Sequence, residues 1–95
     1  MTGAARGIGE SIADALAAAG ASVYAFDIEA PGHSRFHYRQ VDASDSAAVE
    51  AAVAALPGTP TLLVNNAGIT RDRTLARMSD AEWSSVLSVN LTGAF

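Results

Sequence analysis

Three glycines near the start of the chain restrict its fold more than any other feature. Residues 2–9 read TGAARGIG, and a helical pattern of apolar side chains runs over residues 7–19. Gly3 would permit a tight turn, Gly7 would let another group approach the backbone, and Gly9 would let the helix pack closely on a sheet. A glycine-rich turn that opens a helix is typical of α/β sheets, although a flexible Gly/Ala loop would show the same spacing.

Three later segments have the composition of strands. β-Branched and aromatic side chains predict strands at residues 22–27 and 35–41. A continuous apolar run bounded by turn residues predicts a third strand at 61–65, of the kind that is buried on both faces of a parallel sheet. Helical patterns separate these segments, which favours right-handed crossovers and parallel pairing.

Capping residues indicate two further helices. Ser44 or Asp45 can cap a helix that ends near Leu56. Ser79 and Glu82 form a capping box, which opens a helix that runs toward the end of the chain. The order helix, strand, strand, helix, strand, helix predicts an α/β fold, a partial doubly wound parallel sheet of the Rossmann type.

Both ends differ from those of a whole domain of this type. The turn at Gly3 should follow a buried strand, yet only Met1 and Thr2 precede it, and the last helix runs to Phe95 without a stop signal after it. We therefore interpret residues 1–95 as a single incomplete domain, truncated at both ends, which lacks the first strand and the C-terminal half. Because the first strand would lie between the second and the fourth, we expect the isolated chain to be poorly folded and inactive.

Composition argues against several classes of function. A net charge of −4 disfavours nucleic acid and anionic membrane surfaces as partners, and the absence of Cys excludes thiolate chemistry. His33 and His37 lack metal-ligand spacing with carboxylates, so we expect no metal site. No apolar run reaches transmembrane length and no signal peptide is visible, which favours the cytoplasm. All six basic residues are Arg, and the chain has no Lys.

The glycine turn and the next strand predict a dinucleotide site. The N-terminus of the first helix offers free N–H groups to a pyrophosphate, and we assign Gly3, Arg6, Gly7, Ile8 and Gly9 to this contact. Asp27 ends the next strand at the spacing expected of a residue that binds a ribose 2′-hydroxyl. Its carboxylate would repel a 2′-phosphate and favours NAD, whereas Arg6 could pair with that phosphate, so NADP stays an alternative.

Four motifs together resemble one enzyme family. TGAARGIG at 2–9, VDASD at 41–45, NNAG at 65–68 and VNLTGAF at 89–95 have the order and spacing of classical short-chain dehydrogenases/reductases. The resemblance covers essentially the whole chain. The stretch from 65 to 95 is most similar to 3-oxoacyl-[acyl-carrier-protein] reductases and their acetoacetyl-CoA reductase relatives.

The resemblance implies further contacts with the cofactor. Asp42 would contact the adenine amino group, with Ala43 beside it, and the small residues of 65–68 would let the adenosine ribose lie against the backbone. The Asn amides there would tie neighbouring strands together. The residues predicted in this way are Asp42, Ala43, Asn66, Ala67, Gly68 and Val89, the last near the ribose. Each could instead have only a structural role, for example as a turn or cap residue.

The resemblance also implies the chemistry. Family members pass a hydride between the nicotinamide and a carbonyl carbon, with an Asn-Ser-Tyr-Lys tetrad in which Asn90 corresponds to the Asn. The rest of the tetrad is absent, because neither Tyr24 nor Tyr38 stands in a Tyr-x-x-x-Lys frame. Tyr24 is better interpreted as strand packing.

Three functions remain open at this stage. The parent protein is expected to be an oxidoreductase that reduces a 3-oxoacyl thioester. A steroid, polyol or other secondary-alcohol dehydrogenase is the second possibility, and a nucleotide-binding module without catalysis is the third. The family resemblance also implies a parent that assembles as a homodimer or homotetramer.

Overall fold

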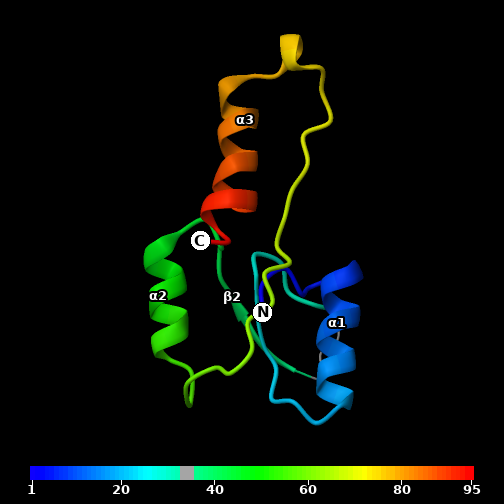
Figure 1. Ribbon diagram of the computed structural model, residues 1–95, viewed down its shortest axis with the longest axis vertical. Helices are drawn as coiled ribbons and strands as arrows, with labels where there is room; N and C mark the ends of the chain where they lie inside the picture. The colour runs from blue at the N-terminus through cyan, green and yellow to red at the C-terminus, as the bar shows by residue number, and fades with distance from the viewer. Residues whose placement is uncertain (33–35) are drawn as a thin grey trace.

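The computed structural model describes residues 1–32 and 36–95 and contains the predicted alternation of helices and strands (Figure 1). The elements are α1 (Gly7–Ala18), β1 (Tyr24–Asp27), β2 (His37–Gln40), α2 (Ser46–Ala54), a short 3-10 turn (Leu75–Arg77), α3 (Asp80–Leu87) and a π-helical turn (Ser88–Thr92). The three predicted helices and the first two predicted strands are confirmed, each with slightly shorter bounds. Residues 33–35, which include His33 and the predicted first residue of the second strand, lie outside the described residues.

The two strands pair in parallel, and the residues before the glycine turn continue the sheet on the other edge of β1. Tyr24 lies opposite His37 and Asp27 lies opposite Gln40. On the other edge of β1, Thr2 forms a single parallel bridge with Phe26. The resulting order, with β2, then β1, then the residues before the glycine turn, is the order of a Rossmann sheet.

The predicted strand at 61–65 is not formed, although the structure describes all of these residues. One backbone hydrogen bond ties the segment to the sheet, from Thr2 N to Val64 O at 3.0 Å. Leu62 and Leu63 are 61% and 68% exposed. The physical reason is that a strand needs hydrogen-bonded neighbours along its whole length, and Thr2 supplies such a bond only at Val64.

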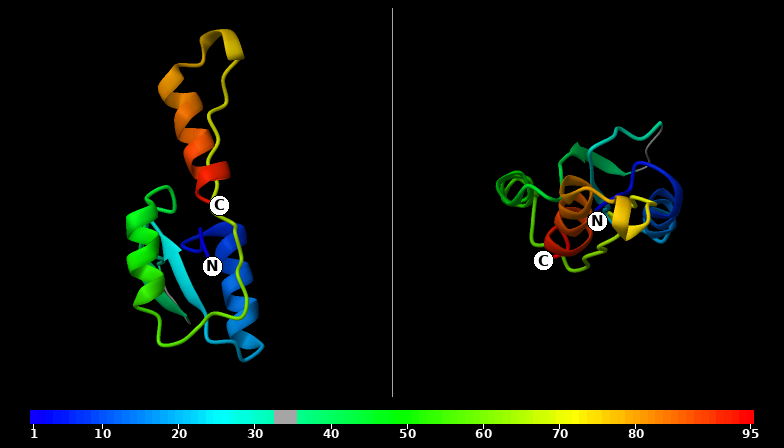
Figure 2. Two further views of the ribbon diagram at one scale, coloured as in Figure 1. Left: turned by 60° about the vertical axis from the view of Figure 1, so that its left-hand side comes forward. Right: turned by 90° about the horizontal axis from the view of Figure 1, so that it is seen from above.

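Each face of the sheet has a small core under one helix. Ala25 and Phe36 pack with Ala13 beneath α1, whereas Phe26 packs with Ala52 beneath α2. Consecutive strand residues such as Ala25 and Phe26 point to opposite faces, which places one core on each side. Figure 2 shows the sheet between the two helices. The helix–sheet–helix layering that the fold class predicts is therefore present.

Helix α3 extends away from these layers as an arm (Figure 2). The predicted capping box is confirmed: Ser79 Oγ accepts from Glu82 N at 3.2 Å, and Ser79 N donates to Glu82 Oε2 at 2.9 Å. The arm gives the chain principal extents of 47 × 26 × 20 Å. Trp83 on α3 and Leu91 in the following turn are 52% and 66% exposed. None of the helices in residues 1–32 and 36–95 combines the length and the hydropathy that a bilayer span requires.

Candidate dinucleotide-binding site

The predicted site residues gather at one end of the sheet. The N-terminal end of α1 lies at the level of the carboxyl end of β1, and the extended segment 66–69 passes beside it toward the base of α3 (Figure 1). In doubly wound sheets, ligands bind outside the carboxyl ends of the strands. The fold therefore brings the glycine turn, the end of β1 and the NNAG motif to the edge where such a ligand belongs.

The three glycines of the turn meet different physical demands. Gly3 and Gly7 have φ values of 68° and 60°, a conformation that other residues rarely adopt. A Cβ on Gly9 would overlap the carbonyl oxygen of Gly3 and the side-chain amide of Asn66, so only glycine fits there. A Cβ on Gly7 would meet nothing within 4 Å. The space beside Gly7 Cα is therefore open.

The start of α1 leaves its backbone donors available to a ligand. Arg6 occupies the N-cap position without a side-chain hydrogen bond to the helix, and Ile8 in the first turn is 76% exposed. Free N–H groups and the positive end of the helix dipole attract phosphate oxygens. The open backbone and the free donors together fit the pyrophosphate of a dinucleotide.

Asn66 and Thr2 fix the glycine turn to the segment that follows residue 65. Asn66 Nδ2 donates to Gly3 O at 2.7 Å, and Thr2 Oγ1 accepts from Asn66 N and from Ala67 N, each at 3.2 Å. These bonds join residues more than 60 positions apart. The family resemblance implied a tie of this kind for the Asn amides, whereas nothing in the sequence indicates the role of the Thr2 hydroxyl beyond its place next to Gly3.

Asp27 joins the end of β1 to the glycine turn. Its Oδ2 accepts from Ala5 N at 2.8 Å and its Oδ1 accepts from Glu29 N at 3.0 Å. Tyr38 Oη donates to the Asp27 carbonyl oxygen at 3.1 Å, and desolvation together with the negative charge of Asp27 raises the pKa of Tyr38. Each carboxylate oxygen of Asp27 can accept a further bond. The carboxylate therefore holds the turn in place and can still receive ribose hydroxyl groups.

Arg6 and Glu29 form an ion pair beside this carboxylate. The Arg6 Nη1 to Glu29 Oε2 distance is 3.1 Å, and the two side chains are 80% and 52% exposed. Arg6 was predicted from the sequence to contact the cofactor, whereas Glu29 was not predicted as a site residue. Glu29 is 23 positions from Arg6, and no local sequence pattern links the two residues. Only the fold places the two charges together.

Asp42 lies in the loop after β2, where Ser44 satisfies it. Asp42 Oδ1 accepts from Ser44 N at 2.8 Å and from Ser44 Oγ at 2.7 Å, and these hydrogen bonds lower the pKa of Asp42. Next to it, Ala43 faces the end of the chain, because a Cβ on Gly93 would stand 3.0 Å from Ala43 O and 2.6 Å from Val89 O. Gly93 therefore lies against the Ala43 backbone, whereas its contact with Val89 is the one expected between residues four positions apart in a helical turn.

The side-chain amide of Asn90 forms two hydrogen bonds with the backbone of one residue. Its Oδ1 accepts from Ile69 N at 2.8 Å, and its Nδ2 donates to Ile69 O at 3.0 Å. Gly68 lies against it, since an added Cβ would stand 3.6 Å from Asn90 Oδ1. Asn90 belongs to the π-helical turn Ser88–Thr92, and such turns often occur at functional sites. The side chain of Asn90 therefore positions the NNAG segment, which sequence analysis did not foresee.

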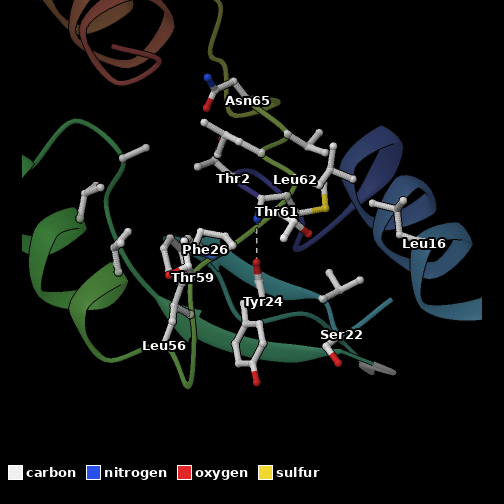
Figure 3. Close-up of a pocket in the computed structure, with 18 of the residues that line it drawn as sticks. Thr2, Leu16, Ser22, Tyr24, Phe26, Leu56, Thr59, Thr61, Leu62 and Asn65 are labelled. Atoms are coloured by element: carbon white, nitrogen blue, oxygen red, sulfur yellow. Dashed lines mark hydrogen bonds between the residues drawn. The ribbon is translucent and has the colours of Figure 1, made fainter. Parts of the chain in front are cut away.

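A cavity of about 640 Å³ lies elsewhere, between β1 and the segment 57–65 (Figure 3). Tyr24, Phe26, Leu56 and Leu62 are among the side chains around it, and Ala43 is the one predicted cofactor residue that lines it. Tyr24 packs there in a stack with His37, with ring centroids 4.6 Å apart, as expected for strand packing. The glycine turn does not line this cavity. It is a space between the sheet and the unpaired 61–65 segment rather than the dinucleotide site.

Acidic and imidazole side chains do not cluster in the described residues. Among residues 1–32 and 36–95, no group of three or more His, Cys, Asp or Glu could hold a metal ion.

Comparison with known proteins gives one consistent result. The short chain dehydrogenase family profile matches residues 1–95. The 3-oxoacyl-[acyl-carrier-protein] reductase of Escherichia coli is 37% identical over 106 aligned residues, which cover 100% of this chain and 43% of the enzyme. The Staphylococcus aureus (strain Mu50 / ATCC 700699) reductase of the same name is 41% identical over 110 aligned residues, or 100% of this chain and 45% of the enzyme. The chain thus spans less than half the length of these curated relatives.

Solved structures agree with this relationship. Ligand-free aldohexose dehydrogenase of Thermoplasma acidophilum has a TM-score of 0.95 and 33% identity, over 98% of this chain and 38% of that one. A 4-hydroxyisoleucine dehydrogenase complexed with NADH and succinate has a TM-score of 0.89 and 28% identity, over 100% of this chain and 46% of that one.

Proposed function

The chain belongs to the short-chain dehydrogenase/reductase family, and on that premise we propose that it forms the cofactor-binding part of an NAD-dependent oxidoreductase. The observation that carries the proposal is the glycine turn, with Gly7 open to solvent and Asp27 bonded to the turn through Ala5. A dinucleotide pyrophosphate would lie at the start of α1, and its adenosine ribose would reach Asp27. NADP is the alternative cofactor, which Arg6 would favour.

The proposed reaction is the reduction of a 3-oxoacyl thioester. The support is the relationship to the 3-oxoacyl-[acyl-carrier-protein] reductases over the whole chain. When bound, the nicotinamide would supply a hydride to the carbonyl carbon, while a general acid supplies the proton to the oxygen. Asn90 is the member of the catalytic tetrad that this sequence contributes. Because the chain has no Lys, we propose that the tetrad is completed outside these 95 residues and that the chain alone is inactive.

A second substrate class is favoured by one residue. A carboxylate at Asp27 selects against a 2′-phosphate and so favours NAD. NAD suits the oxidation of a secondary alcohol better than it suits the reduction of a carbonyl group. The aldohexose and 4-hydroxyisoleucine dehydrogenases share the fold closely. From the family relationship we further propose a cytoplasmic homodimer or homotetramer.

The test is a cofactor and substrate panel with the whole protein that carries this sequence. Oxidation of NADH or NADPH would be followed with acetoacetyl-CoA, and reduction of NAD or NADP with sugars, hydroxy amino acids and steroids. Turnover of acetoacetyl-CoA above every other substrate supports the proposal. Turnover of an alcohol alone would establish the second substrate class, and cofactor binding without any turnover would leave a nucleotide-binding module.

A further inference from the structure

The ion pair between Arg6 and Glu29 flanks Asp27, the residue that we propose receives the adenosine ribose, where the two nicotinamide cofactors differ. Asp27 accepts hydrogen bonds from the backbone of Ala5, the residue before Arg6, and from the backbone of Glu29 itself. The same carboxylate that would receive the ribose therefore sets the positions of both partners. The Arg6 guanidinium and the Glu29 carboxylate lie 3.1 Å apart, and both side chains are largely exposed to solvent.

We propose that Glu29 is a determinant of cofactor selectivity, because it holds the Arg6 guanidinium in an ion pair and so withholds it from a ribose 2′-phosphate. The inference rests on the proposed function, in which the glycine turn binds a nicotinamide dinucleotide. Glu29 would be a second acidic determinant beside Asp27, and Asp27 would act by direct repulsion of the 2′-phosphate. Glu29 acts through Arg6 and is a specificity residue rather than a catalytic one.

Charge around the ribose explains why the effect depends on the cofactor. Asp27, Glu29 and Arg6 together carry a net charge of −1, which opposes a 2′-phosphate of charge close to −2. Without the Glu29 carboxylate the three positions sum to zero, and Arg6 is free to bond the phosphate in the bidentate manner that suits guanidinium groups. A neutral 2′-hydroxyl has no comparable preference for a free Arg6, so the affinity for NAD should change little.

Solvent limits the size of the effect. The side chains of Arg6 and Glu29 are 80% and 52% exposed, so water and salt screen their charges. A charge-assisted bond to a phosphate at such a position is expected to change affinity about tenfold rather than a thousandfold. The gain should shrink as the salt concentration rises, because exposed charges are screened within a Debye length.

The experiment is a fluorescence titration of the whole protein with NADH and with NADPH. In Glu29→Gln, the Kd for NADPH is expected to fall about tenfold while that for NADH changes less than about twofold. Adding Arg6→Ala to Glu29→Gln should cancel the gain, because the effect runs through Arg6. Glu50→Gln on α2 removes the same charge on the far side of the sheet and should leave both constants unchanged.

The possible outcomes separate this inference from the proposed function. If the unaltered protein binds neither NADH nor NADPH, the proposed function fails. If it binds NADH but Glu29→Gln leaves the ratio of the two Kd values unchanged, the proposed function stands and the inference is overturned. An equal gain in Glu50→Gln, or a gain that survives Arg6→Ala, would also overturn it, because general charge rather than the ion pair would then be responsible.

Discussion

Substitution of Gly9 by Ala tests the packing of the glycine turn most directly. The added Cβ would overlap Gly3 O, a backbone atom that cannot move without moving the turn, and it would displace the Asn66 amide from the same oxygen. Overpacking of this kind costs about 1–3 kcal/mol, and the lost hydrogen bond costs about 1 kcal/mol more. Alanine returns about 1 kcal/mol through its helix propensity. We expect a net loss of about 1–3 kcal/mol in the free energy of unfolding, toward the upper end because the overlapped atom belongs to the backbone.

Two other glycines provide matched controls for that substitution. Gly7→Ala places its Cβ in open space but keeps a φ of 60°, so it should cost about 1–2 kcal/mol for the left-handed conformation alone. Gly58→Ala meets no atom within 4 Å and needs no unusual φ, so its effect should stay within about 0.5 kcal/mol. Urea unfolding of the whole protein, with and without NADH, would measure all three.

The order of the three losses in the free energy of unfolding shows whether the overlap at Gly9 limits stability. Gly9→Ala should be the least stable, and it should also weaken NADH binding because the turn moves. A Gly9→Ala protein as stable as Gly58→Ala would refute the reasoning, since the overlap with Gly3 would then be relieved at no cost. A loss at Gly9 that leaves NADH affinity intact would show that the turn does not hold the cofactor.

Three further predictions follow from other parts of the chain. Asn90→Ala should free both backbone groups of Ile69, so amide exchange at Ile69 accelerates in the whole protein, and protection equal to the wild type would contradict the tie. The hydrogen bonds from Ser79 lower the pKa of Glu82, so this carboxylate stabilises α3 above its ordinary pKa and loses that contribution as the pH falls through the lowered value. Circular dichroism should show that acid loss of helix, and Glu82→Gln should remove it. The 95-residue chain alone should melt without a sharp transition in calorimetry, and a cooperative peak would refute this expectation.

The sequence predicted best the features that form within a few residues. The capping box at Ser79 is complete within four positions, and the glycine turn and the first helix are set by neighbouring residues, so local pattern sufficed. The prediction of a strand at 61–65 was wrong because an apolar composition only makes a segment suitable for a buried strand. Whether the strand forms depends on another segment that pairs with it. The bonds of Asn90 to Ile69 and of Arg6 to Glu29 join residues 21 and 23 positions apart, which no local pattern encodes.

The short segment between Asn66 and Ile69 explains why the glycine turn and the NNAG motif occur together. At one end, the Asn66 side chain donates a hydrogen bond to Gly3 O. At the other end, the Asn90 side chain forms hydrogen bonds with both the N–H and the carbonyl group of Ile69. Between them the segment passes close to the glycine turn, because a Cβ on Gly3 would stand 2.7 Å from Ala67 Cα. The cofactor turn and the turn that carries Asn90 are therefore fixed to the same few residues of extended backbone. We therefore expect a displacement of the glycine turn, the proposed dinucleotide site, to change the position of Asn90 as well.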